Sequence, residues 1–494
     1  MEKRFSTLSN QASIKKNIVF QTAYQILNTC LPLVTAPYLA RVLGAEQLGI
    51  FSYTSSIVTY FTLVAMLGTV NYGTRSIASV KDDKEKLSHT FWSIYGFQAL
   101  LTSFVLVVYV FYLIFLCGEN KIIAAIQIIT IIDCFLNINW LFFGLERFQL
   151  TVTRNFIVRI LTVTAIFVFV NKSADLWIYT LLMAGGTLLS NAVVWAYLPK
   201  VVSKAKVRFK DFLPHLKPNL ILFVPLLAMS VYHTMDKTML GLLSTYEQSG
   251  FYYNADKVIN IPVGILTGVS TVLLPRMSSL IADGKKKESD RLFELSLEGV
   301  TVLSVAIAFG ISAIAKEFTP VFFGQGYDEC VLLIIVLSPV LVIKGFSVSA
   351  RNQYLIPYKQ EKIFIRSVVL GAIVNLFINL ALIPSLGAMG AIIGTLIAEF
   401  VACVVQFYVM RKCIKLGAVY KNTIIYFLIG AGMFFCVRLI ARLSFNIYMK
   451  LVVEIIIGAV FYVVACFLYW KLTNNVMYKE VFCGVLNKFH IRNK

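Results

Sequence analysis

The chain has 494 residues, of which 58% are hydrophobic and 14% are charged, with a mean hydropathy of +0.78. Soluble domains carry about 45–50% apolar and about 25% charged residues, so this composition excludes an ordinary water-soluble protein. The formal net charge is +20. In a membrane protein such a charge reflects basic cytoplasmic loops facing anionic lipid headgroups, so we expect membrane lipid, and no nucleic acid, as a partner.

Fourteen apolar segments follow one another along the chain, and each is long enough to cross a bilayer as a helix of about 20 residues. They lie at about 17–39, 47–70, 92–116, 121–144, 152–170, 176–198, 219–241, 250–274, 293–315, 329–350, 363–383, 388–410, 421–441 and 450–470. The sequence therefore predicts an all-α polytopic membrane protein with about 14 transmembrane helices.

Basic residues gather in every second connection between these spans. About 35 of the 45 Lys and Arg residues lie on one side of the predicted topology, which the positive-inside rule makes cytoplasmic. Both termini are then cytoplasmic, because the number of spans is even. Arg438, Arg442 and Lys450 flank the last turn on the outer side, where snorkelling to the interface is favoured over an inverted final hairpin and an anionic lipid headgroup is the functional alternative.

The sequence contains signs of an internal duplication. Pro37-Tyr-Leu-Ala-Arg-Val-Leu-Gly44 leads into Glu46-Gln-Leu-Gly49, and His233-Thr-Met-Asp-Lys-Thr-Met-Leu-Gly241 leads into Glu247-Gln-Ser-Gly250. Gly186-Thr-Leu-Leu and Gly394-Thr-Leu-Ile form a second echo. The two repeat units cover spans one to six and seven to twelve. Because six is even, they insert with the same orientation, which favours two lobes and alternating access by rocking.

This duplication predicts the domain organisation. Residues 1–199 form an N-terminal six-helix lobe, 200–218 a basic cytoplasmic linker and 219–415 a C-terminal six-helix lobe. Residues 416–494 add spans thirteen and fourteen and a cytoplasmic tail.

The sequence favours a transporter over an enzyme. We find no Walker A, HExxH or Gly-x-Ser-x-Gly pattern, and the cysteines never form a CxxC pair, so no cofactor and no metal are expected. The predicted outer connections are short. A membrane glycosyltransferase or polymerase needs a longer outer segment for its active site, which disfavours that class.

Four strings carry a family likeness. They are Pro37-Tyr-Leu-Ala-Arg-Val-Leu-Gly44, Asn71-Tyr-Gly-Thr-Arg-Ser-Ile-Ala78, Asp236-Lys-Thr-Met-Leu-Gly241 and Gly250-Phe-Tyr-Tyr-Asn-Ala-Asp-Lys257. With them the chain resembles the polysaccharide transporter family, whose Wzx-type members are O-antigen and capsule repeat-unit flippases of the multidrug/oligosaccharidyl-lipid/polysaccharide exporter superfamily. The likeness runs through at least spans one to eight and fits the chain in length and span count.

The resemblance implies a fold and a function. The fold is MATE-like, with two six-helix lobes and two extra C-terminal helices. The function is to move an undecaprenyl-diphosphate-linked oligosaccharide from the cytoplasmic to the outer leaflet of the bacterial cytoplasmic membrane during surface polysaccharide assembly. The resemblance also implies a cationic central cavity that holds the anionic headgroup. A polysaccharide polymerase and a chain-length regulator are the expected protein partners.

Six cationic residues within or at the ends of the predicted spans are candidates for binding this headgroup. Arginine suits a diphosphate because its planar guanidinium holds two oxygens at once. A charge inside a span costs about 2.5–3.5 kcal/mol on insertion scales, so such groups face a bundle interior or a wet cavity. The candidates are Arg41, Arg75, Lys237, Lys257, Lys344 and Arg351. For Arg41 and Arg75, at span ends, an interfacial anchor is the alternative.

Five other ionisable residues are candidates for ion coupling or for structural pairs. They are His233, Asp236, Asp256, Asp133 and Glu399. On a helix His233 and Asp236 share a face, whereas Asp236 and Lys237 point about 100° apart. We expect Asp236 or Lys237 to pair across helices with Lys257 or Asp256. Alternatively, Asp236 with His233 takes up a coupling proton or sodium ion.

One rival function shares the same fold. A MATE-like exporter of cationic drugs, coupled to an ion gradient, needs an acid-rich cavity, whereas the candidates here are balanced towards Lys and Arg. The sequence therefore favours the flippase.

Overall fold

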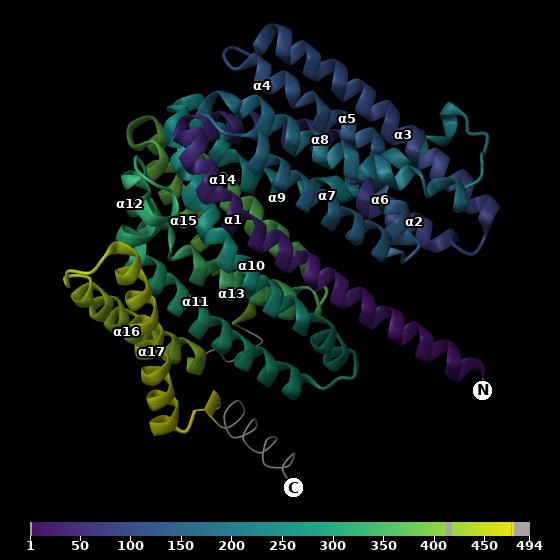
Figure 1. Ribbon diagram of the computed structural model, residues 1–494. Coiled ribbons are helices and arrows are strands. Elements are labelled where there is room, and N and C mark those ends of the chain that lie inside the picture. The colour runs from purple at the N-terminus through teal and green to yellow at the C-terminus, as the bar shows by residue number, and fades with distance from the viewer. Residues whose placement is uncertain (1, 412–416, 476, 479–494) are drawn as a thin grey trace. The chain divides into compact units, whose positions relative to one another are not determined.

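The computed structural model describes residues 2–411, 417–475 and 477–478, with side-chain positions from residue 31 onward except Phe148 and Ala418. The described chain is 87% helical and contains no strand. Figure 1 shows long helices joined by short connections. The predicted all-α membrane fold is confirmed.

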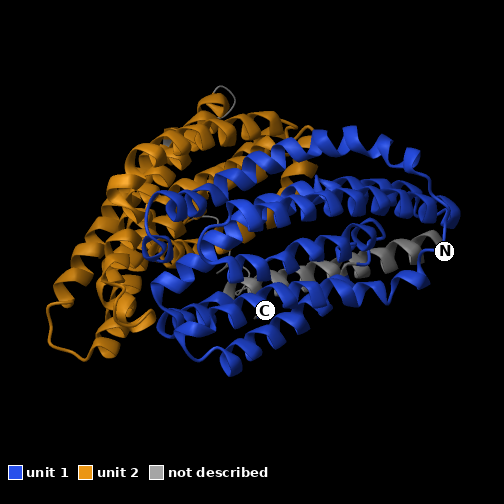
Figure 2. Cartoon of the chain, turned by 90° about the horizontal axis from the view of Figure 1, so that it is seen from above, with its two compact units in different colours: residues 1–250 blue, residues 251–494 orange. Residues whose placement is uncertain are grey.

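The chain divides into two compact units, Met1–Gly250 and Phe251–Lys494, which Figure 2 colours separately. The sequence repeat predicts a different division, into two lobes joined by a linker at 200–218. Those boundaries stay a prediction.

The α-helices of unit 1 range in length from 6 residues in α4 to 65 residues in α1. Their bounds are α1 Glu2–Met66, α2 Thr69–Val80, α3 Lys84–Phe111, α4 Lys121–Ile126, α5 Ile128–Leu136, α6 Asn139–Gly144, α7 Phe148–Phe169, α8 Leu176–Trp195 and α9 Leu213–Leu243. Short π and 3-10 turns lie at η1 Tyr112–Leu116, η2 Ser173–Asp175, η3 Leu198–Lys200 and η4 Phe209–Asp211.

The helix α10, Tyr246–Ala282, starts in unit 1 and continues into unit 2. The rest of unit 2 consists of α11 Lys286–Phe322, α12 Asp328–Leu337, α13 Val340–Ala350, η5 Arg351–Leu355, α14 Glu361–Leu386, α15 Ala388–Met410, α16 Gly417–Ile440 and α17 Ile447–Thr473.

Thirteen stretches of the described chain are long and apolar enough to cross a membrane. The first of them, Leu31–Val80, includes Gly44, where φ of 79° and ψ of 172° interrupt the long helix α1. This interruption separates the first two predicted spans, so the single stretch accounts for both. The count thus agrees with about 14 spans.

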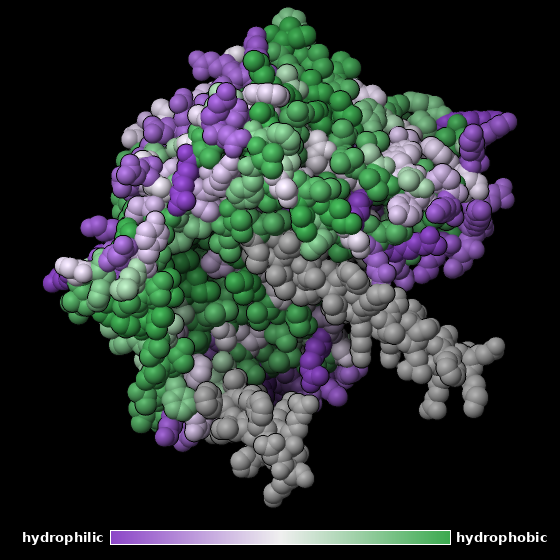
Figure 3. All heavy atoms as spheres, viewed as in Figure 1, coloured by the Kyte–Doolittle hydropathy of each residue, from purple (hydrophilic) through white to green (hydrophobic). Residues whose placement is uncertain are grey.

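The surface is apolar where a soluble protein would be polar. Figure 3 shows broad green areas on the visible face, and large side chains such as Phe104 and Val107 of α3, Phe435 of α16 and Leu472 of α17 are exposed. Continuous apolar surface on this scale requires a non-aqueous neighbour. Polar side chains such as Gln98 are instead fully buried.

The fourth predicted span is broken in two places. Gln127 separates α4 from α5. Between α5 and α6, the residues Asn137 and Ile138 are not helical. Freed backbone carbonyls within a membrane need partners from the protein. Gln98 of α3 donates to the carbonyls of Cys134 at 2.6 Å and Asn137 at 3.1 Å.

Two tryptophans complete the support of this break. Trp195 of α8 donates its indole N–H to the Leu136 carbonyl at 3.0 Å. The buried Trp140 of α6 donates to the Gln98 side-chain oxygen at 3.0 Å and stacks on Phe91, with ring centroids 5.4 Å apart. The break is therefore a fixed feature, and it sets the positions of Asp133 and Asn139 on either side of it.

Candidate functional site

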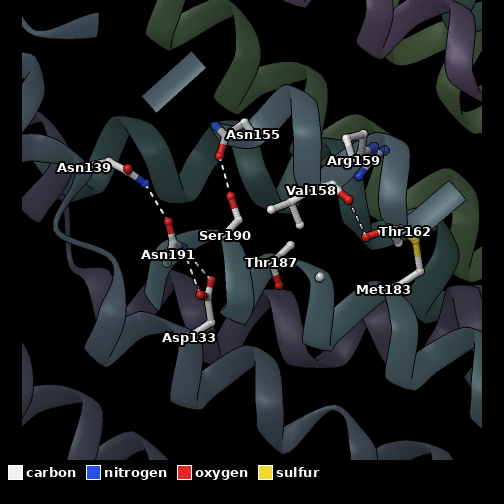
Figure 4. Close-up of a pocket in the computed structure, with 11 residues that line it drawn as sticks. Asp133, Asn139, Asn155, Val158, Arg159, Thr162, Met183, Thr187, Ser190 and Asn191 are labelled. Atoms are coloured by element: carbon white, nitrogen blue, oxygen red, sulfur yellow. Dashed lines mark hydrogen bonds between the residues drawn. The ribbon is translucent and has the colours of Figure 1, made fainter. Parts of the chain in front are cut away.

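A polar, partly open cavity of about 210 Å³ lies among the helices α5, α6, α7 and α8 of unit 1 (Figure 4). It is lined by Asp133, Asn139, Asn155, Val158, Arg159, Thr162, Met183, Gly186, Thr187, Ser190 and Asn191. Amide and hydroxyl side chains dominate this lining, in a region of the chain that is otherwise strongly apolar.

Asp133 belongs to a hydrogen-bond group in the cavity wall that is centred on Asn191. The Asn191 side-chain N–H₂ donates to both carboxylate oxygens of Asp133, at 2.8 and 3.0 Å. Asn139 donates in turn to the Asn191 oxygen at 3.0 Å (Figure 4). The sequence left two roles open for Asp133, ion coupling or a structural pair; the structure gives it one amide partner, Asn191, and both roles stay predictions.

Arg154 lies behind the cavity wall with only 7% of its surface exposed. It donates to the side-chain oxygens of Asn139 at 3.0 Å and Asn155 at 2.8 Å, and more distantly to that of Asn191 at 3.5 Å. A guanidinium is only a donor, so all three amides must turn their oxygens towards it. Their nitrogens therefore point away, and that of Asn191 meets Asp133.

Arg154 and Arg159 lie deeper than the sequence indicates. Both count as basic residues of a cytoplasmic connection in the predicted topology. The helix α7 begins at Phe148, so Arg159 is about 16 Å along the helix axis, roughly halfway across a hydrocarbon core. Asn155 lies one turn before Arg159 on the same face, and this spacing was a signal for a polar helix face.

Among the described residues, Arg159 has no hydrogen-bond or ion-pair partner, although it lines the cavity. Placing a guanidinium at this depth is costly unless it faces polar groups or water. Arg159 is thus a cationic cavity residue that the sequence reasoning missed.

Lys344 and Glu399, candidates for different roles, form an ion pair in unit 2. The Lys344 ammonium nitrogen lies 3.5 Å from Glu399 Oε1, with side chains 15% and 8% exposed. Glu399 lies five residues after Gly394, and Asn191 lies five residues after Gly186. In each repeat, the residue five positions after the glycine contacts a charged side chain. Asn191 contacts Asp133, and Glu399 contacts Lys344.

Arg351 lies in the π-helical turn η5 of unit 2. Its guanidinium donates to Asn352 at 3.0 Å and lies 5.2 Å from the centre of the Phe364 ring. Burial lets this cation–π contact contribute more than it would in water.

Arg41 and Arg75 are exposed side chains. Arg41 lies in α1, one turn before the interruption at Gly44, and Arg75 lies in α2. Their exposure is compatible both with an interfacial anchor and with a headgroup contact, so their roles stay predictions.

The candidates of α9 and α10 differ in burial. Asp236 is 4% exposed, while Lys237 is half-buried and His233 is exposed beside the Tyr232 ring. Their predicted pairing with Asp256 or Lys257, and the coupling role of Asp236 with His233, stay predictions.

Within α10, both candidates have local partners. The Lys257 ammonium lies 4.0 Å from the centre of the Tyr253 ring. Asp256 accepts a hydrogen bond from Asn260 at 2.6 Å.

The basic residues of the last turn, which fit poorly in the predicted topology, meet an acid of α11. Arg438 donates to Glu317 at 2.7 Å, and the Lys450 ammonium lies 3.5 Å from the other oxygen of Glu317. Glu317 is 5% exposed. These contacts join α16 and α17 to α11, so two of the three basic residues have a structural partner, while Arg442 is exposed.

A second cluster in unit 1 was not predicted. The His215 ring of α9 lies between the hydroxyls of Tyr72, 2.8 Å from Nδ1, and Ser93, 2.5 Å from Nε2. Ser93 donates to the Asp211 carbonyl, so its oxygen accepts from Nε2–H and Nδ1 accepts from Tyr72. The cluster fixes the start of α9 against α2 and α3.

Comparison with known proteins gives the family. The model of the family described as "Polysaccharide biosynthesis protein" matches residues 14–281, more than half of the chain. The chain belongs to this family. It is therefore a membrane transporter of polysaccharide biosynthesis and not an enzyme.

Two relatives extend over most of the chain. A protein of Escherichia coli (strain K12) named "Putative O-antigen transporter" is 23% identical over 395 residues, covering 79% of this chain and 95% of its own. The "Capsular polysaccharide biosynthesis protein CapF" of Staphylococcus aureus is 22% identical over 414 residues, covering 80% and 99%.

Solved structures show the same fold. A structure of "Lipid II flippase MurJ, inward closed conformation" matches with a TM-score of 0.78 at 15% identity, covering 93% of this chain and 100% of its own. An inward-facing MATE family transporter of the MOP superfamily matches with a TM-score of 0.58 at 15% identity, covering 80% and 97%. The predicted MATE-like fold is confirmed.

Proposed function

We propose that the protein is a flippase that moves an undecaprenyl-diphosphate-linked oligosaccharide from the inner to the outer leaflet of the bacterial cytoplasmic membrane. The transported molecule is a repeat unit for O-antigen, capsule or exopolysaccharide. The observation that carries this proposal is the polar, partly open cavity among the apolar helices of unit 1, in a chain of a polysaccharide biosynthesis family.

The chemistry of this substrate sets a requirement that the cavity meets in part. A diphosphate and a sugar chain cannot cross hydrocarbon unaided, because their charges and hydroxyls lose water without replacement. A transporter must therefore offer hydrogen-bonding groups at membrane depth. Asn155, Arg159 and Thr187 do this in unit 1.

The diphosphate requires positive charge, which the candidate cations supply. We propose that Arg41, Arg75, Lys237, Lys257 and Arg351 contribute to a cationic path, and that Lys344 does so when its pair with Glu399 opens. Rocking of two repeat-related lobes would expose this path alternately to the two leaflets. A proton or sodium ion taken up by Asp236 with His233 would couple this cycle to an ion gradient.

The cellular setting follows from the same proposal. Both termini lie in the cytoplasm, and the flipped repeat unit is delivered to a polysaccharide polymerase and a chain-length regulator at the outer face.

A reconstituted assay tests the function. Proteoliposomes carrying a fluorescent undecaprenyl-diphosphate-linked oligosaccharide in the inner leaflet would be exposed to a membrane-impermeant quencher. We expect the protein to make the label accessible at least tenfold faster than in protein-free liposomes, with no change in substrate mass. A product of altered mass would indicate an enzyme, and an unchanged rate would contradict the proposal.

The cationic path has its own test. The triple variant Arg41→Ala, Arg75→Ala, Lys237→Ala should flip the substrate at least tenfold more slowly, because the diphosphate loses three positive groups. Arg442→Ala removes an exposed arginine outside this set and is the matched control. Full activity of the triple variant would contradict the role of these residues.

A further inference from the structure

The size of the unit 1 cavity limits what it can hold. Pockets for drug-sized molecules have volumes of about 300–1,000 Å³. The cavity has a volume of about 210 Å³, which suits one small ring, and Thr187 in its lining is exposed, so the rest of an oligosaccharide would lie outside it. Its walls combine polar groups with the apolar side chains of Val158 and Met183.

The hydrogen-bonding groups of the cavity are both donors and acceptors. The Asn155 oxygen accepts from Arg154 and from Ser190, the latter at 2.6 Å, so its N–H₂ group is left as a donor, and no described residue accepts from it. Arg159 adds a second donor.

The hydrogen-bond acceptors of the cavity come from α5, α7 and α8. Thr162 and Thr187 donate their hydroxyl hydrogens to backbone carbonyls of their own helices, at 2.9 and 2.8 Å, so their oxygens are free to accept. The Asp133 carboxylate keeps acceptor capacity beyond its two bonds to Asn191.

This mixture fits one class of ligand. A diphosphate needs donors, and the Asp133 carboxylate would repel it. A metal ion needs several oxygen or nitrogen ligands, and the described residues contain no group of three His, Cys, Asp or Glu that could hold one. Arg159 would also repel a cation. A sugar ring offers hydroxyls that donate and accept, with C–H faces that suit Val158 and Met183.

We propose that this cavity is a subsite for a single sugar ring of the transported molecule, a proposal that rests on the proposed flippase function. Asn155 and Arg159 donate to ring hydroxyls, and Asp133, Thr162 and Thr187 accept from them. Arg154 is a positioning residue, since it orients the Asn155 amide without lining the cavity.

The test compares carriers with and without a sugar. Binding to the full-length protein in nanodiscs would be measured for undecaprenyl diphosphate and for the same carrier bearing glucose, galactose or N-acetylglucosamine. We expect the wild-type protein to bind at least one sugar-bearing carrier about tenfold more tightly than the bare carrier, as one or two added hydrogen bonds allow.

Two variants remove cavity groups while preserving the wall. Asn155→Asp keeps the oxygen that accepts from Arg154 and Ser190 but replaces the donor. Thr187→Val removes a hydroxyl at nearly constant volume. Each should abolish most of the sugar preference, so that sugar-bearing and bare carriers bind with similar affinity. Thr164→Val, an exposed position of α7 outside the cavity, is the matched control and should keep the preference.

Three results would overturn the subsite. They are equal binding of all carriers by the wild-type protein, equal weakening of bare and sugar-bearing carriers in both variants, and the same loss in Thr164→Val. With flipping intact in proteoliposomes, each of these leaves the proposed function standing. Absence of both flipping and carrier binding overturns function and subsite together.

Discussion

At the scale of single residues, one buried arginine organises the candidate site. Arg154 faces the oxygens of Asn139, Asn155 and Asn191, and this sets the direction of all three amides. Hydrogen bonds from a charged donor contribute about 1.5–3 kcal/mol each, more than neutral ones. The polar cavity therefore depends on a residue that does not itself line it.

Removal of this arginine should loosen the cavity wall. Arg154→Met keeps most of the volume but leaves the Asn139 oxygen without a donor and removes the charged donor of the Asn155 and Asn191 oxygens. We expect a loss of stability of about 2–4 kcal/mol. Thermal unfolding in detergent, with the exposed Arg442→Met as control, measures this. An unfolding midpoint equal to that of the control would show that the amides find other partners.

The ion pair of unit 2 allows a second residue-scale prediction. Lys344→Glu places a carboxylate beside Glu399 in a buried site, and Glu399→Lys places two cations together. Breaking a buried pair costs about 3–5 kcal/mol because the remaining charge is uncompensated. The double reversal should recover most of this stability. If it is no more stable than the single variants, the pair does not hold α13 to α15.

At the scale of elements, a duplicated glycine sets a close helix contact within unit 1. A Cβ built on Gly49 would overlap the Tyr246 carbonyl oxygen, and one on Gly250 would overlap the Ala45 carbonyl oxygen. The two Glu-Gln-x-Gly strings thus make reciprocal contacts. This symmetry is what an internal duplication would leave behind.

Alanine at these glycines should therefore force backbone movement. We expect Gly49→Ala and Gly250→Ala each to lower stability by about 2 kcal/mol or more, since the obstructing atoms belong to the backbone. Gly185→Ala in α8 is the matched control, because a Cβ there meets no atom within 4 Å. The yield of folded protein and the unfolding temperature report the difference. Equal values for Gly49→Ala and Gly185→Ala would disprove the close contact.

Sequence patterns predicted most spans but not how a span is interrupted. Long apolar runs give helices in a membrane because every backbone group must be satisfied within the segment. No glycine or proline marks the break after Asp133 in the sequence. The break is stabilised by Gln98 and Trp195, which belong to other helices and are distant in sequence. Asp133 was foreseen because a charge stands out in an apolar run, whereas the neutral amides Asn155 and Asn191 do not.

At the scale of the whole molecule, the charge of +20 is explained by topology more than by substrate. Most basic residues fall in the connections predicted to face the cytoplasm, and several of the remainder are paired, as Lys344 is with Glu399 and Arg438 with Glu317. Net charge therefore does not identify an anionic cargo. Arg159, which lines the unit 1 cavity and has no ion-pair partner among the described residues, is more informative.

The predicted orientation can be tested over the whole chain by single-cysteine labelling. In a cysteine-free background, Lys204→Cys and Lys287→Cys should react with an impermeant maleimide only after the cells are opened, because the positive-inside rule places them in the cytoplasm. Glu119→Cys and Lys172→Cys should react in intact cells. All four positions are exposed, so the side of the membrane decides their reactivity. Labelling of Lys204→Cys in intact cells, with protection of Lys172→Cys, would contradict the predicted topology. The opposite orientation would also reverse the direction of the proposed transport.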